Sequence, residues 1–279
     1  DRSLWCSVLA QMHVEPPLPS GAGVVFSHDS RFVLHCAEEE IQVTSTATGE
    51  QIHSLVGHTD LVTDLALHSK NSSQVYSSSL DGTIRLWDFV EASLLRTIDL
   101  VDPVSFLCII NSRPNLAMAC TLKKLPEGGE DVYGDGCKPH SCVSSVNLKN
   151  GKRRQLFLCR KRARICASPD GSAALAVAGR TLSIWDFNKS ALTKLKHKER
   201  LTCLAVHPDG SCIATGDWRG EIVLWYGCLP GQDQATTKVA PPKSGGCMHW
   251  HAHPVRSLAF TTDGAHLMSG GEEGVLVVW

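Results

Sequence analysis

The stretch that decides the fold of this chain is SSSLDGTIRLWD, residues 77–88. Its Asp81-Gly82 pair is typical of a type I′ hairpin turn, because these residue types tolerate the positive φ angles that such a turn needs. Residues 83–87 are rich in β-branched and aromatic side chains, which predicts a strand. Upstream, residues 61–67 alternate between two faces with the period of a strand. These patterns predict short strands joined by tight turns.

Weaker copies of this stretch recur along the chain. Residues 182–186, 221–225 and 275–279 repeat its apolar strand and its tryptophan. In the best-preserved copy a Gly-His pair at 57–58 precedes the first strand, and a Trp-Asp pair at 87–88 closes the third. Repeats of about 40 residues with these two pairs are typical of WD-repeat proteins, in which each repeat supplies four short strands. The chain resembles that family, and we expect an all-β fold, a WD-repeat β-propeller of four-stranded antiparallel blades.

The repeats predict about six blades, whereas propellers of this family usually have seven. The six blades start near residues 22, 61, 104, 164, 201 and 255, and those that start near 22 and 104 lack the tryptophan. We assign residues 1–21 to an N-terminal segment with a candidate ring-closing strand, and residues 22–279 to the propeller. Because residue 279 falls on the third strand of the last blade, we expect a fragment of a longer protein with an incomplete C-terminus.

The polar residues of the repeats have an expected structural use. The resemblance implies that a loop histidine, a strand serine or threonine, a hairpin aspartate and the tryptophan indole form a hydrogen-bonded chain inside each blade. A buried indole N–H needs an acceptor and a buried carboxylate needs donors, which supports such a chain. In three blades the matching residues are His58, Ser77, Asp81 and Trp87; His197, Thr215 and Trp225; and His253, Ser269 and Trp279. Arg219 falls at the aspartate position of the second set, and Glu273 replaces the aspartate in the third.

Serine, histidine and aspartate also make up the catalytic triad of many hydrolases. The structural interpretation accounts for the tryptophan and for the spacing of the four residues, whereas a triad accounts for neither. We therefore predict no catalytic residue and no enzymatic activity. Loss of hydrolysis on Ser77→Ala would support the enzyme hypothesis, and loss of stability would support the structural one.

Composition excludes several classes of protein. The net charge is −1 and the pI is about 6.9, so no global field favours nucleic acid or membranes. No apolar run reaches the roughly 20 residues that span a bilayer. The twelve cysteines form no Cys-x-x-Cys pair, which favours reduced thiols in a cytosolic or nuclear protein. His249, His251 and His253 share a strand face but lack a carboxylate or cysteine partner nearby, so we predict no metal and no other cofactor.

A basic run stands out from this nearly neutral background. It is a candidate for contacts with RNA phosphates or for a nuclear address, and a solvated blade edge remains the alternative. Two insertions, residues 123–140 and 226–246, are glycine-rich and predict loops. The basic run consists of Lys149, Lys152, Arg153, Arg154, Arg160, Lys161, Arg162 and Arg164.

Three segments carry a closer resemblance: residues 247–251 with the strands after them, residues 57–63, and residues 76–84. They are similar to the first propeller of a family of nucleolar WD-repeat proteins in the small-subunit processome, whose second propeller is absent here. The resemblance implies a non-catalytic scaffold of ribosome biogenesis, active in pre-rRNA processing and linked rDNA transcription.

The partners implied are other WD-repeat processome subunits, pre-ribosomal RNA and the small nucleolar ribonucleoprotein, with no membrane and no small-molecule substrate. The implied location is the nucleolus within the nucleus, and the basic run would then bind phosphates without sequence preference. The alternative is a general WD-repeat adaptor, such as a ubiquitin-ligase substrate receptor or a chromatin adaptor.

Overall fold

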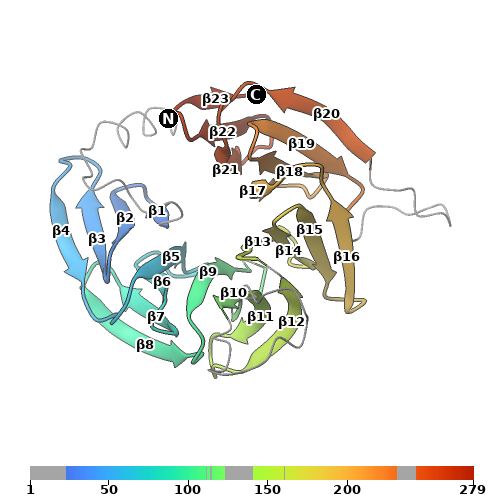
Figure 1. The fold of residues 1–279 in the computed structure, drawn as a ribbon. Helices are drawn as coiled ribbons and strands as arrows, with labels where there is room; N and C mark the ends of the chain where they lie inside the picture. Colours follow the sequence, from blue (N-terminus) through green and yellow to red (C-terminus); the bar gives the residue numbers. More distant parts are fainter. Residues whose placement is uncertain (1–22, 111, 114, 123–140, 160, 231–242) are drawn as a thin grey trace, which may run out of the picture.

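The chain folds as a propeller of antiparallel blades, as the repeats predict (Figure 1). The computed structural model describes residues 23–110, 112–113, 115–122, 141–159, 161–230 and 243–279. The candidate ring-closing strand in residues 1–21 and the insertion at 123–140 lie outside the described residues. In the described ranges every regular element is a β-strand.

Among the residues that the structure describes, twenty-three strands make six sheets in sequence order. The first three blades consist of β1 (Val24–Phe26), β2 (Phe32–Ala37), β3 (Glu40–Ser45) and β4 (Gln51–Leu55); β5 (Val62–Leu67), β6 (Gln74–Ser79), β7 (Thr83–Asp88) and β8 (Ser93–Asp99); and β9 (Val104–Ile109), β10 (Leu116–Leu122), β11 (Ser141–Asn147) and β12 (Arg153–Cys159).

The last three blades consist of β13 (Arg164–Ala167), β14 (Ala173–Ala178), β15 (Thr181–Asp186) and β16 (Ala191–Lys196); β17 (Leu201–Val206), β18 (Cys212–Asp217), β19 (Glu221–Tyr226) and β20 (Lys243–His249); and β21 (Val255–Phe260), β22 (Leu267–Gly271) and β23 (Leu276–Val278). The sixth blade thus has three strands among the described residues. The loop predicted for residues 226–246 was too long at its end, because β20 begins at Lys243 and pairs with β19.

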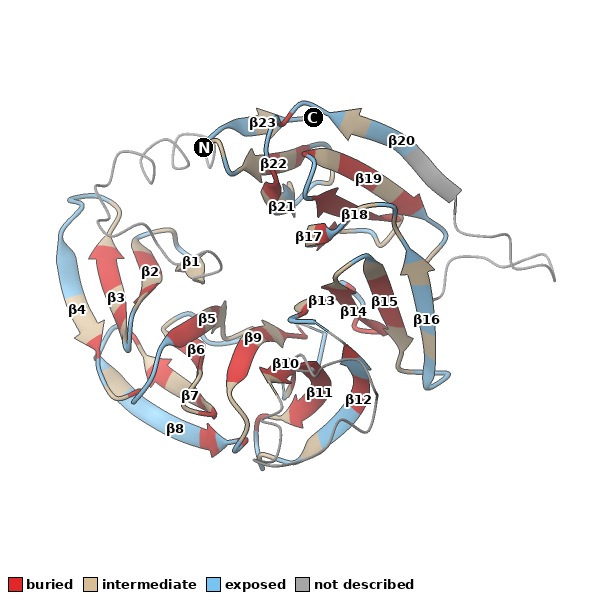
Figure 2. Cartoon of the chain, viewed as in Figure 1, coloured by how far each residue is buried: buried red, intermediate tan, exposed pale blue. Residues whose placement is uncertain are grey.

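The hydrophobic core lies between neighbouring blades, because each sheet covers the face of the next (Figure 2). One cluster joins Ile84 of blade 2 to Leu107 of blade 3, and another joins Leu175 of blade 4 to Ile213 of blade 5. The middle strand β14 reads AALAVA and is buried almost throughout, whereas the outer strand β16 is largely exposed. Small side chains in a middle strand let the neighbouring sheet approach closely and cover that strand. The outer strand has no such cover, so burial falls from the middle of each blade to its outer edge.

Successive blades are also joined by hydrogen bonds near the start of their inner strands. The Thr63 hydroxyl donates to the Val104 carbonyl at 2.9 Å, and the Thr202 hydroxyl donates to the Val255 carbonyl at 2.5 Å. The Asp64 carboxylate accepts the Leu107 amide at 3.0 Å. These bonds fix one blade on the next at the inner rim of the propeller.

The hairpin in the stretch that decides the fold is not a type I′ turn, in contrast to the prediction. Residues 80–82 connect β6 to β7, and within that loop only Gly82 has a positive φ, of 86°. A Cβ atom there would lie 2.9 Å from the Val101 carbonyl oxygen. Glycine is therefore required by both backbone conformation and space, while Asp81 stays in the ordinary region of φ and serves through its side chain.

Candidate functional site

The polar residues of blade 2 form one continuous hydrogen-bonded chain. The indole N–H of Trp87 donates to the Ser77 hydroxyl at 2.8 Å, and Ser77 Oγ lies 2.7 Å from His58 Nε2. His58 Nδ1 lies 2.7 Å from the Asp81 carboxylate. If His58 carries its proton on Nδ1, every donor in the chain meets an acceptor. The structure thus brings all four residues together.

The ionisation of this chain follows from its burial. Burial lowers the pKa of His58 below its usual value, against the opposing effect of the Asp81 hydrogen bond. Burial raises the pKa of Asp81, but hydrogen bonds from His58 and Thr83 more than offset that effect and leave the pKa low. At neutral pH the arrangement is a neutral imidazole beside a carboxylate that also accepts the backbone amide of Thr83 at 2.8 Å.

The Ser77–His58–Asp81 order matches the connectivity of a catalytic triad, but the surroundings do not suit one. The Ser77 residue is 0% exposed, and its oxygen already accepts the indole N–H of Trp87. A nucleophile must reach a carbonyl carbon beside donors that can hold an oxyanion. Because Ser77 is packed under the indole, a substrate carbonyl cannot reach its oxygen. The hydrogen-bonded residues therefore support the blade from within.

Blade 5 keeps only the inner half of this chain. The Trp225 indole donates to the Thr215 hydroxyl at 2.8 Å, and that hydroxyl donates to the Val223 carbonyl at 3.5 Å. His197 instead accepts the backbone amide of Glu199 on Nδ1 at 3.1 Å. The sequence missed Asp217, which is 1% exposed and lies with one carboxylate oxygen 3.9 Å from His197 Nδ1. The signal in the sequence was a carboxylate only two residues before Arg219, the residue that replaces the hairpin aspartate.

In blade 6 the predicted histidine was wrong. His253 is exposed, and the chain runs through His251, whose Nδ1 lies 2.5 Å from Glu273 and whose Nε2 lies 2.7 Å from Ser269 Oγ. The Trp279 indole donates to Ser269 at 2.9 Å. The spacing to the inner strand explains the correction, because His58, His197 and His251 each precede the first residue of β5, β17 or β21 by four positions.

The basic run divides between two parts of the fold. Lys149, Lys152 and Arg154 are exposed on the hairpin that leads into the outer strand β12 and on that strand itself. Arg153 is engaged internally, since its guanidinium donates to Asp102 at 2.8 Å and to Thr121 at 2.6 Å. Arg160 lies outside the described residues. A surface made by all eight cations together is therefore not what the structure shows.

The remaining cations of the run line a cavity at the inner rim. Lys161 and Arg162 are exposed just before β13, and Arg164 is its first residue. The cavity has a volume of about 250 Å³. Its lining residues are Phe106, Lys161, Arg162, Arg164, Val177, Gly179, Arg200, Leu201, Thr202, Trp218 and Arg256.

Sequence analysis missed the contribution of Arg200, Trp218 and Arg256 to this cavity. Trp218 and Arg256 stand apart from any run of cations, whereas Arg200 belongs to a separate basic group with Lys194, Lys196 and Lys198 that the prediction did not include. Arg200 directly precedes β17, and Arg256 is the second residue of β21. Their positions at the starts of inner strands were the available signal, because the inner strands of a propeller lie side by side.

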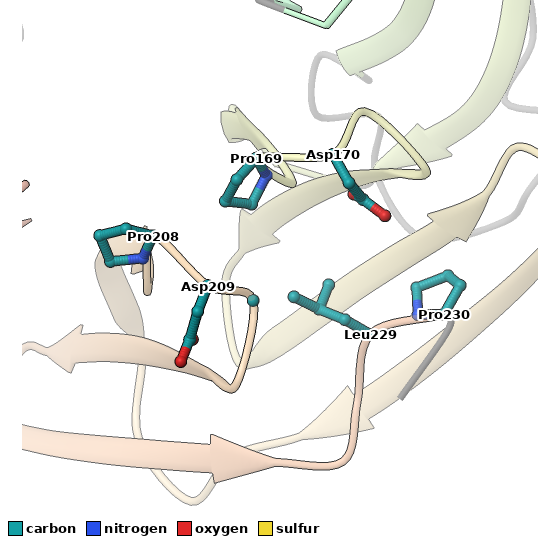
Figure 3. Close-up of a pocket in the computed structure, with 7 residues that line it drawn as sticks. Pro169, Asp170, Pro208, Asp209, Leu229 and Pro230 are labelled. Atoms are coloured by element: carbon teal, nitrogen blue, oxygen red, sulfur yellow. The ribbon is translucent and has the colours of Figure 1, made fainter. Parts of the chain in front are cut away.

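A second cavity, of about 210 Å³, lies at the turns that follow β13 and β17 (Figure 3). Its labelled residues are Pro169, Asp170, Pro208, Asp209, Leu229 and Pro230. The Asp170 carboxylate accepts the Ser168 hydroxyl at 2.6 Å, and the Asp209 carboxylate accepts the Ser211 amide at 2.7 Å. These carboxylates close their own turns, which accounts for their position.

The described residues were also compared with the requirements of metal sites, disulfides and membrane-spanning helices. Within the described ranges no three histidine, cysteine or carboxylate side chains gather as a metal site would require, including around His249, His251 and His253. The ten cysteines in those ranges are free thiols, most of them buried. The described part of the chain also contains no helix that is long and apolar enough to cross a membrane.

Comparison with known proteins identifies the relatives of this propeller. The family model described as WD repeat-containing protein 75 first beta-propeller matches residues 25–124 and 157–279. WD repeat-containing protein 75 of Mus musculus is 32% identical over 281 residues, 91% of this chain and 30% of that protein. The Xenopus laevis protein of the same name is 34% identical over 264 residues, again 91% and 30%.

A more distant relative is the U3 small nucleolar RNA-associated protein 17 of Schizosaccharomyces pombe, 25% identical over 283 residues, 94% of this chain and 33% of that protein. The chain thus spans roughly 30% of the length of the curated relatives it matches.

Proposed function

The chain belongs to the family of the first β-propeller of WD repeat-containing protein 75, and on that basis we propose that it is a non-catalytic scaffold module of ribosome biogenesis. In this role it acts in the small-subunit processome of the nucleolus, in pre-rRNA processing and linked rDNA transcription. The observation that carries the proposal is the family match, together with a relative whose name places it with U3 small nucleolar RNA.

A scaffold needs rigid surfaces for several partners, and the propeller supplies them. Its blades are fixed to one another by buried clusters and by the threonine hydrogen bonds at the rim. Loops and edge strands on such a frame are the usual places for contacts. The partners we propose are other WD-repeat processome subunits, pre-ribosomal RNA and the small nucleolar ribonucleoprotein.

Two exposed basic surfaces support a contact with RNA. Lys149, Lys152 and Arg154 on the outer hairpin form the first, and Lys161 and Arg162 at the rim cavity belong to the second. Cations that meet RNA phosphates give affinity without sequence preference. Arg153 is excluded from this role, because its guanidinium is paired with Asp102 inside blade 3.

The test is a pulldown of the tagged protein from nuclear extract at mild salt, followed by mass spectrometry and RNA sequencing. We expect other WD-repeat processome subunits together with the 5′ external spacer of pre-ribosomal RNA. Recovery of a cullin adaptor or of chromatin proteins, without pre-ribosomal RNA, would replace the proposal with the general adaptor function. An unrelated WD-repeat propeller with the same tag is the control for proteins that bind any propeller.

A further inference from the structure

The rim cavity concentrates positive charge from three blades. Lys161, Arg162 and Arg164 come from the start of blade 4, Arg200 from blade 5 and Arg256 from blade 6. Arg256 pairs with Glu272 at 2.9 Å, but the other four have no carboxylate within 4.0 Å in the part of the chain that the structure describes. Like charges that converge in this way repel one another, and a bound polyanion relieves that repulsion.

One of these cations is held in the wall of the cavity. Burial lowers the pKa of the Arg164 guanidinium, which donates a hydrogen bond to the Arg256 carbonyl at 3.1 Å. Arg164 thus ties blade 4 to blade 6. Lys161, Arg162 and Arg200 are exposed, and they are the groups free to meet a ligand.

Aromatic rings accompany the cations. The guanidinium of Arg200 lies 5.6 Å from the ring centre of Trp218, and those of Arg162 and Arg164 lie 5.4 and 5.6 Å from that of Phe106. Trp218 is 49% exposed, an unusual state for so large an apolar side chain. Cations beside exposed aromatic rings are the arrangement by which proteins hold single-stranded nucleic acid, with phosphates on the cations and bases stacked on the rings.

We propose that this rim cavity is a binding site for single-stranded RNA, with phosphates held by Lys161, Arg162 and Arg200 and one base stacked on Trp218. The inference rests on the proposed function only in that the function brings the chain to RNA. A cavity of about 250 Å³ suits one nucleotide unit and not a duplex. An acidic peptide would satisfy the cations but would bring no base to stack on the exposed ring of Trp218.

The experiment measures the affinity of the purified chain for a fluorescein-labelled single-stranded RNA of ten nucleotides, over a range of salt concentrations. Trp218→Ala is expected to weaken binding between about fivefold and a hundredfold, the range measured for loss of one stacked base. Trp218→Phe, which keeps a flat ring, should recover most of the affinity. The matched control is Trp250→Ala, because Trp250 is 70% exposed but lies outside the cavity; it should stay within twofold of wild type.

The charges are tested by the salt dependence. Each phosphate contact contributes about 0.7 to the slope of log K against log salt for a single strand, so R162A/R200A should reduce the slope by about 1.4. The triple variant K149A/K152A/R154A removes positive charge from the outer hairpin instead. In that variant Trp218→Ala should still weaken RNA binding by the same factor. Thermal unfolding of each variant checks that the propeller is folded.

Three results would overturn the inference. The first is unchanged affinity in both Trp218→Ala and R162A/R200A, and the second is loss of binding only in the outer-hairpin variant. The third is a phosphoserine peptide that binds as tightly as the RNA and whose affinity does not change in Trp218→Ala. The proposed function fails separately. If wild type binds the RNA through Trp218 but the pulldown lacks processome subunits, the scaffold proposal is wrong and the cavity stands. If Trp218→Ala and R162A/R200A both bind the probe normally and still recover those subunits with the same pre-ribosomal RNA, the cavity assignment is wrong and the scaffold stands.

Discussion

Blades 2 and 5 are built on the same pattern and use it differently. In both, the inner strand contains a register shift at its second residue, and the threonine there donates to the first residue of the next blade. In both, the indole of the third strand donates to a hydroxyl on the second strand. The pattern therefore secures the same two joints in each blade, one between blades and one within the blade.

The two blades differ at the hairpin and at the inner strand. Asp81 closes the polar chain of blade 2, whereas the equivalent Arg219 is exposed and lies 3.3 Å from Glu199. Next to it, Trp218 turns outward into the rim cavity. The same repeat can therefore have two uses. In blade 2 the hairpin residue Asp81 forms hydrogen bonds inside the blade, whereas in blade 5 the hairpin residues Trp218 and Arg219 are exposed to solvent.

The largest expected difference comes from the two loop histidines. His58→Ala leaves the Asp81 carboxylate and the Ser77 hydroxyl buried without their common partner, and should lower the free energy of unfolding by about 3 kcal/mol. His197→Ala removes one bond to a backbone amide and should lower it by about 1 kcal/mol. Urea unfolding followed by tryptophan fluorescence measures both. Equal losses would break the distinction between the blades.

Asp64 of blade 2, where blade 5 has Cys203, predicts a pH dependence. Burial raises the pKa of Asp64 to about 6 in the folded chain, above the ordinary value of about 3.8. A raised pKa favours the protonated folded state, so this contribution to stability is complete below pH 3.8 and is lost as the pH rises through 6. Asp64→Asn should remove this component, on the order of 2 kcal/mol. Urea titrations of both proteins at pH 4, 5, 6 and 7 measure it; a constant difference between them would contradict it.

Blade 6 sharpens the comparison with a matched pair of histidines. His251→Ala should lower the free energy of unfolding by about 1–2 kcal/mol, because it leaves the Ser269 hydroxyl and the Glu273 carboxylate without their shared partner. His253→Ala, two residues away and exposed, should change it by less than about 0.5 kcal/mol. Thermal unfolding of the two variants side by side decides between them. A larger loss from His253 would restore the assignment made from the sequence.

The smallest expected effect is that of Arg219. Its ion pair with Glu199 is exposed on the arginine side, so Arg219→Ala should change the free energy of unfolding by less than about 0.5 kcal/mol. The same urea series that serves His58 provides the measurement. A loss of more than 1 kcal/mol would mean that Arg219 replaces Asp81 as a structural residue in blade 5.

The strands and the polar residues of blade 2 could be predicted from the sequence alone. The strands follow from period-two alternation and turn residues, which act locally, and the chain of His58, Ser77, Asp81 and Trp87 follows from one well-preserved repeat. The histidine of blade 6 was misassigned because two candidates stand two residues apart, and only their distance from β21 separates them. The involvement of Asp217 was missed because it occupies a position that holds a serine, Ser79, in blade 2.

The sequence by itself determined the all-β fold, the blades and the buried chain of blade 2, because each depends on residues close together in one repeat. Only the tertiary structure separated the basic run into an outer surface, an internal ion pair and a rim cavity. It also brought Arg200, Trp218 and Arg256 to that cavity from other repeats. The physical reason is the closure of strands around an axis: the starts of successive inner strands, about 40 residues apart in the chain, meet at one rim.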